Sequence, residues 1–234
     1  MGDVITVVVT GAGAPGIAGT IYSLKNNPDE LPFRIISTDV KSDPVGRYLA
    51  DEFYKVPTPE DKEYIQSIKK IAIEEKVKVI IPQTSREIIS LSQHLDEFRE
   101  IDVSVIVSDY ASIRRANDKY LIIKECKNTN VPYPEYFLID NEKDFHSSLE
   151  KLGYPNNKVV VKPRFSSGLR GLRIISNETL TINEFLEEKP TGLNIDLESI
   201  LKIFRNGPFP EMLVTEYLPG DEYSVDVFRN SNGT

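Results

Sequence analysis

VVVKPRFSSGLRGLRII, residues 159–175, is the stretch of sequence that decides how this chain folds. Three valines lead into Lys162 and Pro163. A loop rich in serine and glycine follows at positions 166–171, and a pair of isoleucines then restores the apolar pattern. This order predicts a strand, a glycine loop and a second strand. A lysine that closes a buried strand, followed by a loop whose backbone can approach a ligand closely, indicates a polyphosphate site, because it supplies a fixed cation and many N–H donors.

The glycine loop differs from the Walker A phosphate loop. It lacks a Gly-Lys-Ser or Gly-Lys-Thr ending and leads into a strand, so no helix N-terminus holds the anion. A second motif follows at residues 213–227, LVTEYLPGDEYSVDV. Its pattern predicts a strand ending at Glu216, a break at Pro219 and Gly220, and another alternating strand from Glu222.

These motifs, together with NDKY at residues 117–120, resemble the ATP-grasp superfamily, most closely its carbamoyl-phosphate-synthase-like and PylC-like ligases. The resemblance covers nearly the whole chain. It implies that Lys119 and Lys162 bind ATP phosphates and that the glycine loop folds over them as a lid. The loop residues implied in phosphate contact are Ser166, Ser167, Gly168 and Gly171.

The resemblance also implies how the rest of ATP is bound. Glu216, Tyr217 and Leu218 match the hinge that reads the adenine edge, largely through backbone groups. Glu222 matches the residue that binds the ribose hydroxyls.

Three other loop residues complete the expected lid. Arg170 and Arg173 are candidates for phosphate contact, although an arginine of a flexible lid is as often solvated. Leu169 departs from the family pattern, because a small residue is expected at its position.

Composition places the chain among ordinary globular proteins, since 40% of its 234 residues are hydrophobic and 27% are charged. The 28 basic and 36 acidic side chains divide evenly between residues 1–115 and 116–234, so neither half is a basic patch for nucleic acid or a membrane surface. No apolar run reaches the about 20 residues of a membrane helix, and no signal peptide is recognisable. We therefore expect a cytoplasmic protein.

Cysteine and histidine indicate no metal site. Cys126 is the single cysteine and has no metal-ligand spacing around it, so a packing role is favoured over a catalytic nucleophile. His94 and His146 lie on expected helices without a second histidine or cysteine four residues away. We expect no metal ligand within this chain.

The N-terminal region offers a competing interpretation. An apolar strand at residues 4–9 leads into GAGAPG, residues 11–16, and a helix over residues 17–25. This is formally the Gly-x-Gly-x-x-Gly pattern of a dinucleotide site, and Asp39 stands where a ribose-binding acid would. An NAD(P)-dependent oxidoreductase is therefore an alternative. Tight turns in any doubly wound sheet also favour glycine. The absence of a catalytic Tyr-x-x-x-Lys or similar base near a predicted cleft makes this alternative the weaker one.

Strands and helices alternate through the first 115 residues, which predicts a parallel sheet with right-handed crossovers. The expected elements are helices over residues 61–77 and 85–98 and strands over residues 34–38, 77–82 and 103–107. Residues 50–57 and 80–88 also resemble the Rossmann-like pre-ATP-grasp domain, which carries no NAD in that family.

A substrate cleft is expected at the carboxyl ends of these strands, where ligands of open parallel sheets bind. Its candidate residues are Gly11, Gly13, Asp39 and Glu87. The alternative, that Asp39 and Glu87 are solvated loop acids, fits the sequence equally well.

Two domains are expected, a pre-ATP-grasp domain over residues 1–115 and an ATP-grasp domain over residues 116–234. Asp118 suits the N-cap of a helix over residues 119–127. The role of Lys119 depends mainly on the resemblance, and a solvated helix lysine is its alternative. Beyond the two motifs, the second domain is expected to contain a strand at 135–139 and helices at 142–152 and 196–204.

The expected fold class is α/β, a Rossmann-like parallel sheet followed by an α+β domain that is truncated at its C-terminus. Residues 223–228 alternate like a hairpin strand and RNSNG at 229–233 predicts a turn, but only Thr234 follows. In ATP-grasp proteins the magnesium ligands and much of the acceptor site come after this point, so we expect this chain alone to be inactive.

The resemblance implies an ATP-dependent, C–N bond-forming ligase. With ATP and Mg²⁺, such a protein phosphorylates a small carboxylate or carbamate to an acyl phosphate, which an amine or ammonia attacks. Barriers of this kind fall through positioning and charge neutralisation. A homodimer is compatible with the sequence, the acceptor is not readable, and a nucleotide-binding module without catalysis is a third interpretation.

Overall fold

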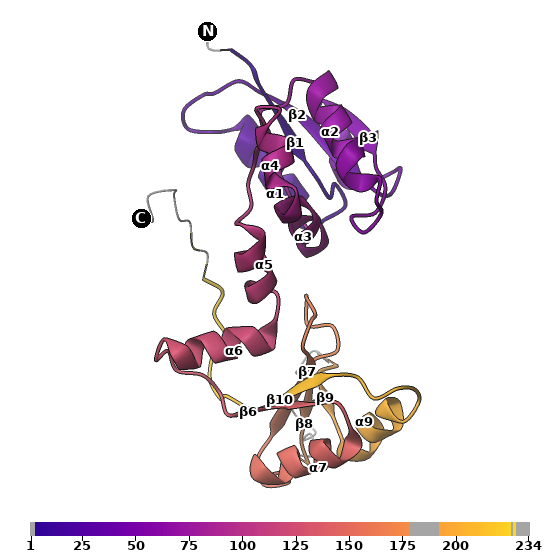
Figure 1. Ribbon diagram of the computed structural model, residues 1–234, viewed down its shortest axis with the longest axis vertical. Helices are drawn as coiled ribbons and strands as arrows, with labels where there is room; N and C mark the ends of the chain where they lie inside the picture. The colour runs from indigo at the N-terminus through magenta and orange to yellow at the C-terminus, as the bar shows by residue number, and fades with distance from the viewer. Residues whose placement is uncertain (1–2, 178–191, 226, 228–234) are drawn as a thin grey trace, which may run out of the picture. The chain divides into compact units, whose positions relative to one another are not determined.

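The chain divides into two compact units, Met1–Asn117 and Asp118–Thr234. The computed structural model (Figure 1) describes residues 3–177, 192–225 and 227.

The first unit is a parallel sheet of five strands in the order β3-β2-β1-β4-β5. Helices cover both of its faces, and the α/β class predicted from the alternating pattern is confirmed. Its elements are β1 (Ile5–Val9), α1 (Ile17–Lys25), β2 (Phe33–Asp39), the 3₁₀ helix η1 (Val45–Tyr48), β3 (Glu52–Lys55), α2 (Tyr64–Glu74), β4 (Val79–Ile81), α3 (Ser85–Gln93), α4 (Leu95–Arg99), β5 (Ser104–Val105) and α5 (Tyr110–Ala116).

Alternating side chains of the central strands build two cores, one on each face of the sheet. Val8 and Ile36 pack with Tyr64 and Ile68 of α2, whereas Val7 and neighbouring apolar residues pack with α1. Because β1 is buried on both faces, it is a nearly continuous apolar run.

The helix predicted over residues 85–98 is wrong in one respect, since it breaks at His94 into α3 and α4. The His94 ring nitrogen Nδ1 lies 2.8 Å from the carbonyl oxygen of Ser90. This is the carbonyl that the His94 backbone N–H would use in a continuous helix, and that N–H bonds Leu91 instead.

The second unit is a mostly antiparallel five-stranded sheet in the order β6-β10-β7-β8-β9, with only β8 and β9 parallel. Helices α7 and α9 pack on one of its faces through Phe145, Leu149, Ile200 and Phe204. Its elements are α6 (Lys119–Asn128), β6 (Tyr136–Ile139), α7 (Glu142–Lys151), β7 (Val159–Pro163), β8 (Arg173–Ile175), β9 (Asn194–Ile195), α9 (Leu197–Phe204) and β10 (Met212–Glu216).

The strand expected from Glu222 is not formed in the described residues 222–225. Residue 226 and the turn expected at 229–233 lie outside the described part of the chain.

Candidate functional site

The strand pairing of β7 fixes the direction of Lys162. Val159 and Val161 belong to the core beneath α7 and α9. Since side chains alternate along a strand, Lys162 emerges on the opposite face of the sheet, where its register partner on β10 is Leu213. The lysine predicted to bind phosphate therefore lies on the sheet face that these two helices leave uncovered.

Lys119 lies at the first position of α6 and contacts the glycine loop. Its ammonium nitrogen Nζ donates to the carbonyl oxygen of Ser166 at 2.6 Å and to the Ser166 hydroxyl at 2.9 Å. The solvated-lysine alternative is therefore wrong for Lys119, because its head group is tied to residue 166.

The two lysines also act on each other electrostatically. Burial lowers the pKa of Lys162, and the nearby positive charge of Lys119 lowers it further. Burial likewise lowers the pKa of Lys119, against the opposing effect of the Asp118 carboxylate. Two partly desolvated cations close to each other form a site that an anion would stabilise.

Three residues of the glycine loop have positive φ angles, a backbone conformation that favours glycine. Gly168 and Gly171 have positive φ angles of 60° and 75°, and Leu169 has a φ of 60°. The departure noted at Leu169 is thus a residue in the left-handed region with its side chain exposed. A β-carbon on Gly171 would lie only 2.5 Å from Cγ of Pro163, so the loop returns directly over the end of β7.

Among the described atoms, the side chains of Arg170 and Arg173 donate hydrogen bonds only to residues close to them in sequence. Nη1 of Arg170 donates to the carbonyl and hydroxyl oxygens of Ser167 at 3.0 and 3.1 Å, and Nη1 of Arg173 donates to the carbonyl of Leu172. The contact with Ser167 folds Arg170 back over the loop.

The hinge begins where β10 ends. The Glu216 carboxylate accepts a hydrogen bond from the Glu135 backbone N–H at 2.8 Å, and the Glu216 N–H donates to the Glu135 carbonyl. The carboxylate is therefore occupied by the chain itself. A cavity of about 460 Å³ adjoins Glu216 and Tyr217 beside the residues that follow α7.

Leu218 and Glu222 are exposed beyond the hinge. No contact in the described residues joins either of them to Lys119 or Lys162. The structure thus brings together the lysines and Ser166, but it leaves the predicted ribose ligand apart from them.

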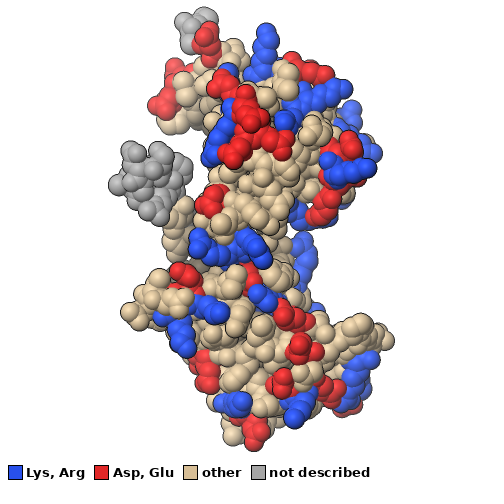
Figure 2. Space-filling view, viewed as in Figure 1, with Lys and Arg blue, Asp and Glu red and all other residues tan. Residues whose placement is uncertain are grey.

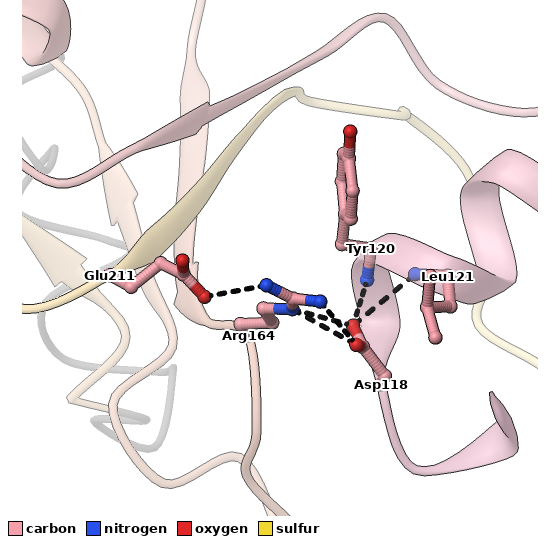
Figure 3. A network of polar contacts seen from close by, with 5 residues as sticks. All are labelled: Asp118, Tyr120, Leu121, Arg164 and Glu211. Carbon is pink, nitrogen blue, oxygen red and sulfur yellow. Dashed lines mark hydrogen bonds and ion pairs between the residues drawn. The ribbon is translucent and has the colours of Figure 1, made fainter. Parts of the chain in front are cut away.

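Arg164 is a residue of this site that sequence reasoning missed (Figure 3). Its guanidinium binds the Asp118 carboxylate through Nε, at 2.9 Å from Oδ1, and through Nη2, at 2.7 Å from Oδ2. Nη1 donates to Glu211 at 2.9 Å. The sequence signal was an arginine two positions after Lys162, which alternation places on the same side of the strand.

In the first unit, the GAGAPG loop is closed on itself. The backbone N–H groups of Ala12, Gly13 and Ala14 donate to Thr38, to the Asp39 carboxylate at 2.7 Å, and to Gly11. A pyrophosphate at this loop would find these donors already paired, and Asp39 holds the loop instead of offering a free carboxylate to a ribose. These contacts weigh against the dinucleotide interpretation.

The two candidate cleft acids are buried, so the solvated-acid alternative is wrong for both. Asp39 is 9% exposed and also accepts from the Lys41 N–H. Glu87 is 4% exposed and accepts from the hydroxyls of Thr84 at 2.8 Å and Tyr64 at 3.4 Å. Burial raises the pKa of Glu87 despite these hydrogen bonds. Gly11 lies against the same carboxylate.

Within the described ranges, no three His, Cys, Asp or Glu side chains gather in a metal-binding group. The carboxylates nearest the lysine site, Asp118 and Glu211, are both committed to Arg164.

Surface charge and helix length bear on other partners. Lys, Arg, Asp and Glu side chains are interspersed over each unit on the face shown in Figure 2, in keeping with the net charge of −8. None of the described helices combines the length and apolar character that crossing a bilayer requires.

Comparison with known proteins finds two similarities, one within the N-terminal unit and one in the fold. Residues 7–106 match the family model described as "PylC-like, N-terminal domain". N5-carboxyaminoimidazole synthetase from Staphylococcus aureus, crystallised with ADP, is similar over 92% of this chain and 48% of its own, with a TM-score of 0.62 and 18% identity.

A second similar structure is the biotin carboxylase domain dimer of Hydrogenobacter thermophilus 2-oxoglutarate carboxylase, solved with MgADP, ADP and bicarbonate. It matches over 91% of this chain and 44% of its own, with a TM-score of 0.60 and 17% identity. The chain thus spans about half the length of these structures and shares their fold, as predicted from the resemblance to ATP-grasp ligases.

Proposed function

We propose that this chain, which carries a PylC-like N-terminal domain and the fold of ATP-grasp ligases, is the ATP-binding part of an ATP-dependent carboxylate–amine ligase. The observation that carries the proposal is the convergence of Lys119 and Lys162 beside the glycine loop. These partly desolvated cations suit the β- and γ-phosphates of a nucleotide. The ADP bound in two proteins of the same fold supports the same ligand class.

Each proposed ligand has a distinct task. The two ammonium groups would neutralise the phosphates, and the backbone N–H groups of residues 166–171 would bind the phosphate oxygens and exclude water. The occupied carboxylate of Glu216 leaves the backbone of residues 216–218 to bind adenine, with Glu222 proposed for the ribose. The strand ends at Gly11, Gly13, Asp39 and Glu87 are proposed to line the substrate cleft.

The proposed reaction is transfer of the γ-phosphoryl group to a carboxylate or carbamate oxygen, followed by attack of an amine or ammonia and loss of phosphate. Mg²⁺ would supply charge neutralisation between the phosphates. We place the reaction in the cytoplasm, and we propose a homodimer since one protein of this fold was solved as a dimer.

Calorimetric titration with MgATP and, side by side, with NADH tests the proposal. We expect MgATP to bind and NADH not to bind, and we expect Lys162→Ala to weaken ATP binding by at least about 10-fold. Lys202→Ala is the matched control, because Lys202 is an exposed lysine of α9 on the opposite sheet face. Binding of NADH alone, or unchanged ATP affinity in Lys162→Ala, would overturn the assignment.

A further inference from the structure

The pair formed by Asp118 and Arg164 joins two parts of the site that are 46 residues apart in sequence. The guanidinium group of Arg164 makes a forked contact with both carboxylate oxygens of Asp118 (Figure 3). Arginine gives this geometry because its planar group presents parallel N–H donors, which a lysine ammonium cannot do.

The same carboxylate begins α6. Oδ1 of Asp118 accepts the backbone N–H of Tyr120 at 3.0 Å and that of Leu121 at 3.2 Å, as an N-cap does. Lys119 lies between the cap and these donors, and its own N–H donates to the Arg164 carbonyl at 3.3 Å. The backbone that carries the Lys119 side chain is therefore held from both sides.

Each guanidinium nitrogen of Arg164 already donates to a carboxylate, so turning Arg164 toward a phosphate would break this network. Nη1 is bound to Glu211, and the guanidinium carbon lies 5.2 Å from the ring centres of both Tyr120 and Phe165. Asp118 is only 2% exposed, so its charge depends on this partner. Burial alone would raise the pKa of Asp118, but the bonds from Arg164 and the helix N–H groups keep it below its ordinary value.

The two lysines need such an anchor because their charges repel. Lys162 is fixed by strand pairing, whereas Lys119 lies at the end of a helix that could shift away from it. Arg164 follows Lys162 by two residues, so a bond from Arg164 to the start of α6 ties the positions of both lysines to one strand.

We propose that Asp118 and Arg164 are positioning residues, which hold the Lys119 ammonium at a fixed place relative to Lys162 so that both bind one polyphosphate. This inference rests on the proposed ATP site. It assigns to the pair an effect on ligand affinity that acts through Lys119.

A double-mutant cycle in MgATP affinity, measured by calorimetry, tests this inference. Asp118→Asn keeps an oxygen for the helix cap but removes the charge, so it separates capping from pairing. We expect it to weaken binding about 10-fold, the effect of losing about 1.4 kcal/mol. In a Lys119→Gln background the same change should weaken binding less than about 2-fold, because the group that it positions is gone.

Arg164→Lys is the second variant and carries the cycle if Asp118→Asn does not fold. It keeps the charge but loses the fork, and we expect a loss similar to that of Asp118→Asn. Glu211→Gln is the control, since it removes only the charge at the far side of Arg164, and it should change affinity less than about 2-fold.

Equal losses in the wild-type and Lys119→Gln backgrounds, or wild-type affinity in both Asp118→Asn and Arg164→Lys, would overturn the inference and leave the ATP site standing. Absence of MgATP binding by the wild-type chain would instead overturn the proposed function, and the inference with it.

Discussion

Gly171 and Gly168 form a matched pair that measures how firmly the glycine loop is seated on β7. Alanine at either position must adopt a positive φ angle, which costs about 1–2 kcal/mol. At Gly168 the nearest atom to an added β-carbon is Nη1 of Arg170 at 3.6 Å, the mobile end of a long side chain. Gly168→Ala should therefore cost little beyond the backbone term.

At Gly171 the added β-carbon would meet Cγ and Cδ of Pro163 at 2.5 and 2.9 Å. A clash with a ring in the backbone of β7 costs about 1–3 kcal/mol more, as overpacking does elsewhere. We expect the Tm of Gly171→Ala to fall below that of Gly168→Ala by about 2–12 °C, since about 1 kcal/mol shifts Tm by 2–4 °C in a chain of this size.

The assay is thermal unfolding followed by circular dichroism, with MgATP titration of both variants. Gly171→Ala should also weaken ATP binding more, because Pro163 directly follows Lys162. Equal Tm values for the two variants would refute the reasoning, since they would mean that the loop lifts from Pro163 without cost.

Three further outcomes are expected. Lys162→Met should weaken MgATP binding about 10- to 150-fold, because a charged hydrogen bond is worth about 1.5–3 kcal/mol. The same variant should raise the Tm of the free chain, since it removes a buried charge. A lower Tm, or an equal loss of MgATP affinity in the Lys202→Met control, would contradict this. The pKa values of Lys162 and Lys119 lie below the ordinary 10.5, so ATP affinity should fall as pH rises toward 10.5. The free chain should gain stability over the same pH range, because the unfolded chain binds more protons there. An ATP affinity that does not change between pH 7.5 and 10 would contradict this prediction. The pKa of Glu87 lies above 4.5, so its stabilising contribution is present below pH 4.5 and is lost as pH rises through the raised pKa. In urea unfolding, the stability of Glu87→Gln should not show this loss. The same pH dependence in Glu87→Gln and the wild-type chain would contradict the prediction.

Local patterns predicted much of the second unit. The Asp118 cap and the strand ending near Lys162 each depend on a few neighbouring residues, and both are found. Arg164 could not be assigned in this way, because its partner Asp118 is 46 residues away and no spacing rule joins them.

The elements that were missed or misjudged also have physical reasons. Helix α5 contributes no buried residue, so it leaves no apolar period to recognise. The break at His94 depends on a side chain that competes for a helix carbonyl. The GAGAPG loop matches a dinucleotide pattern in letters, and only the structure reveals that its N–H groups are paired within the chain.

The pairing of β7 with β10 has a consequence for the kinds of sequence change that this gene can accept. Because faces alternate residue by residue, a single codon inserted between Val159 and Lys162 would turn the lysine toward Phe145 and bring a valine to the other face. A substitution in this strand changes one side chain and leaves the others on their faces of the sheet. An insertion or deletion of one residue moves every side chain at this end of the strand to the opposite face. We therefore expect the length of the segment from Val159 to Arg164 to be far less variable among descendants of this sequence than its amino acids.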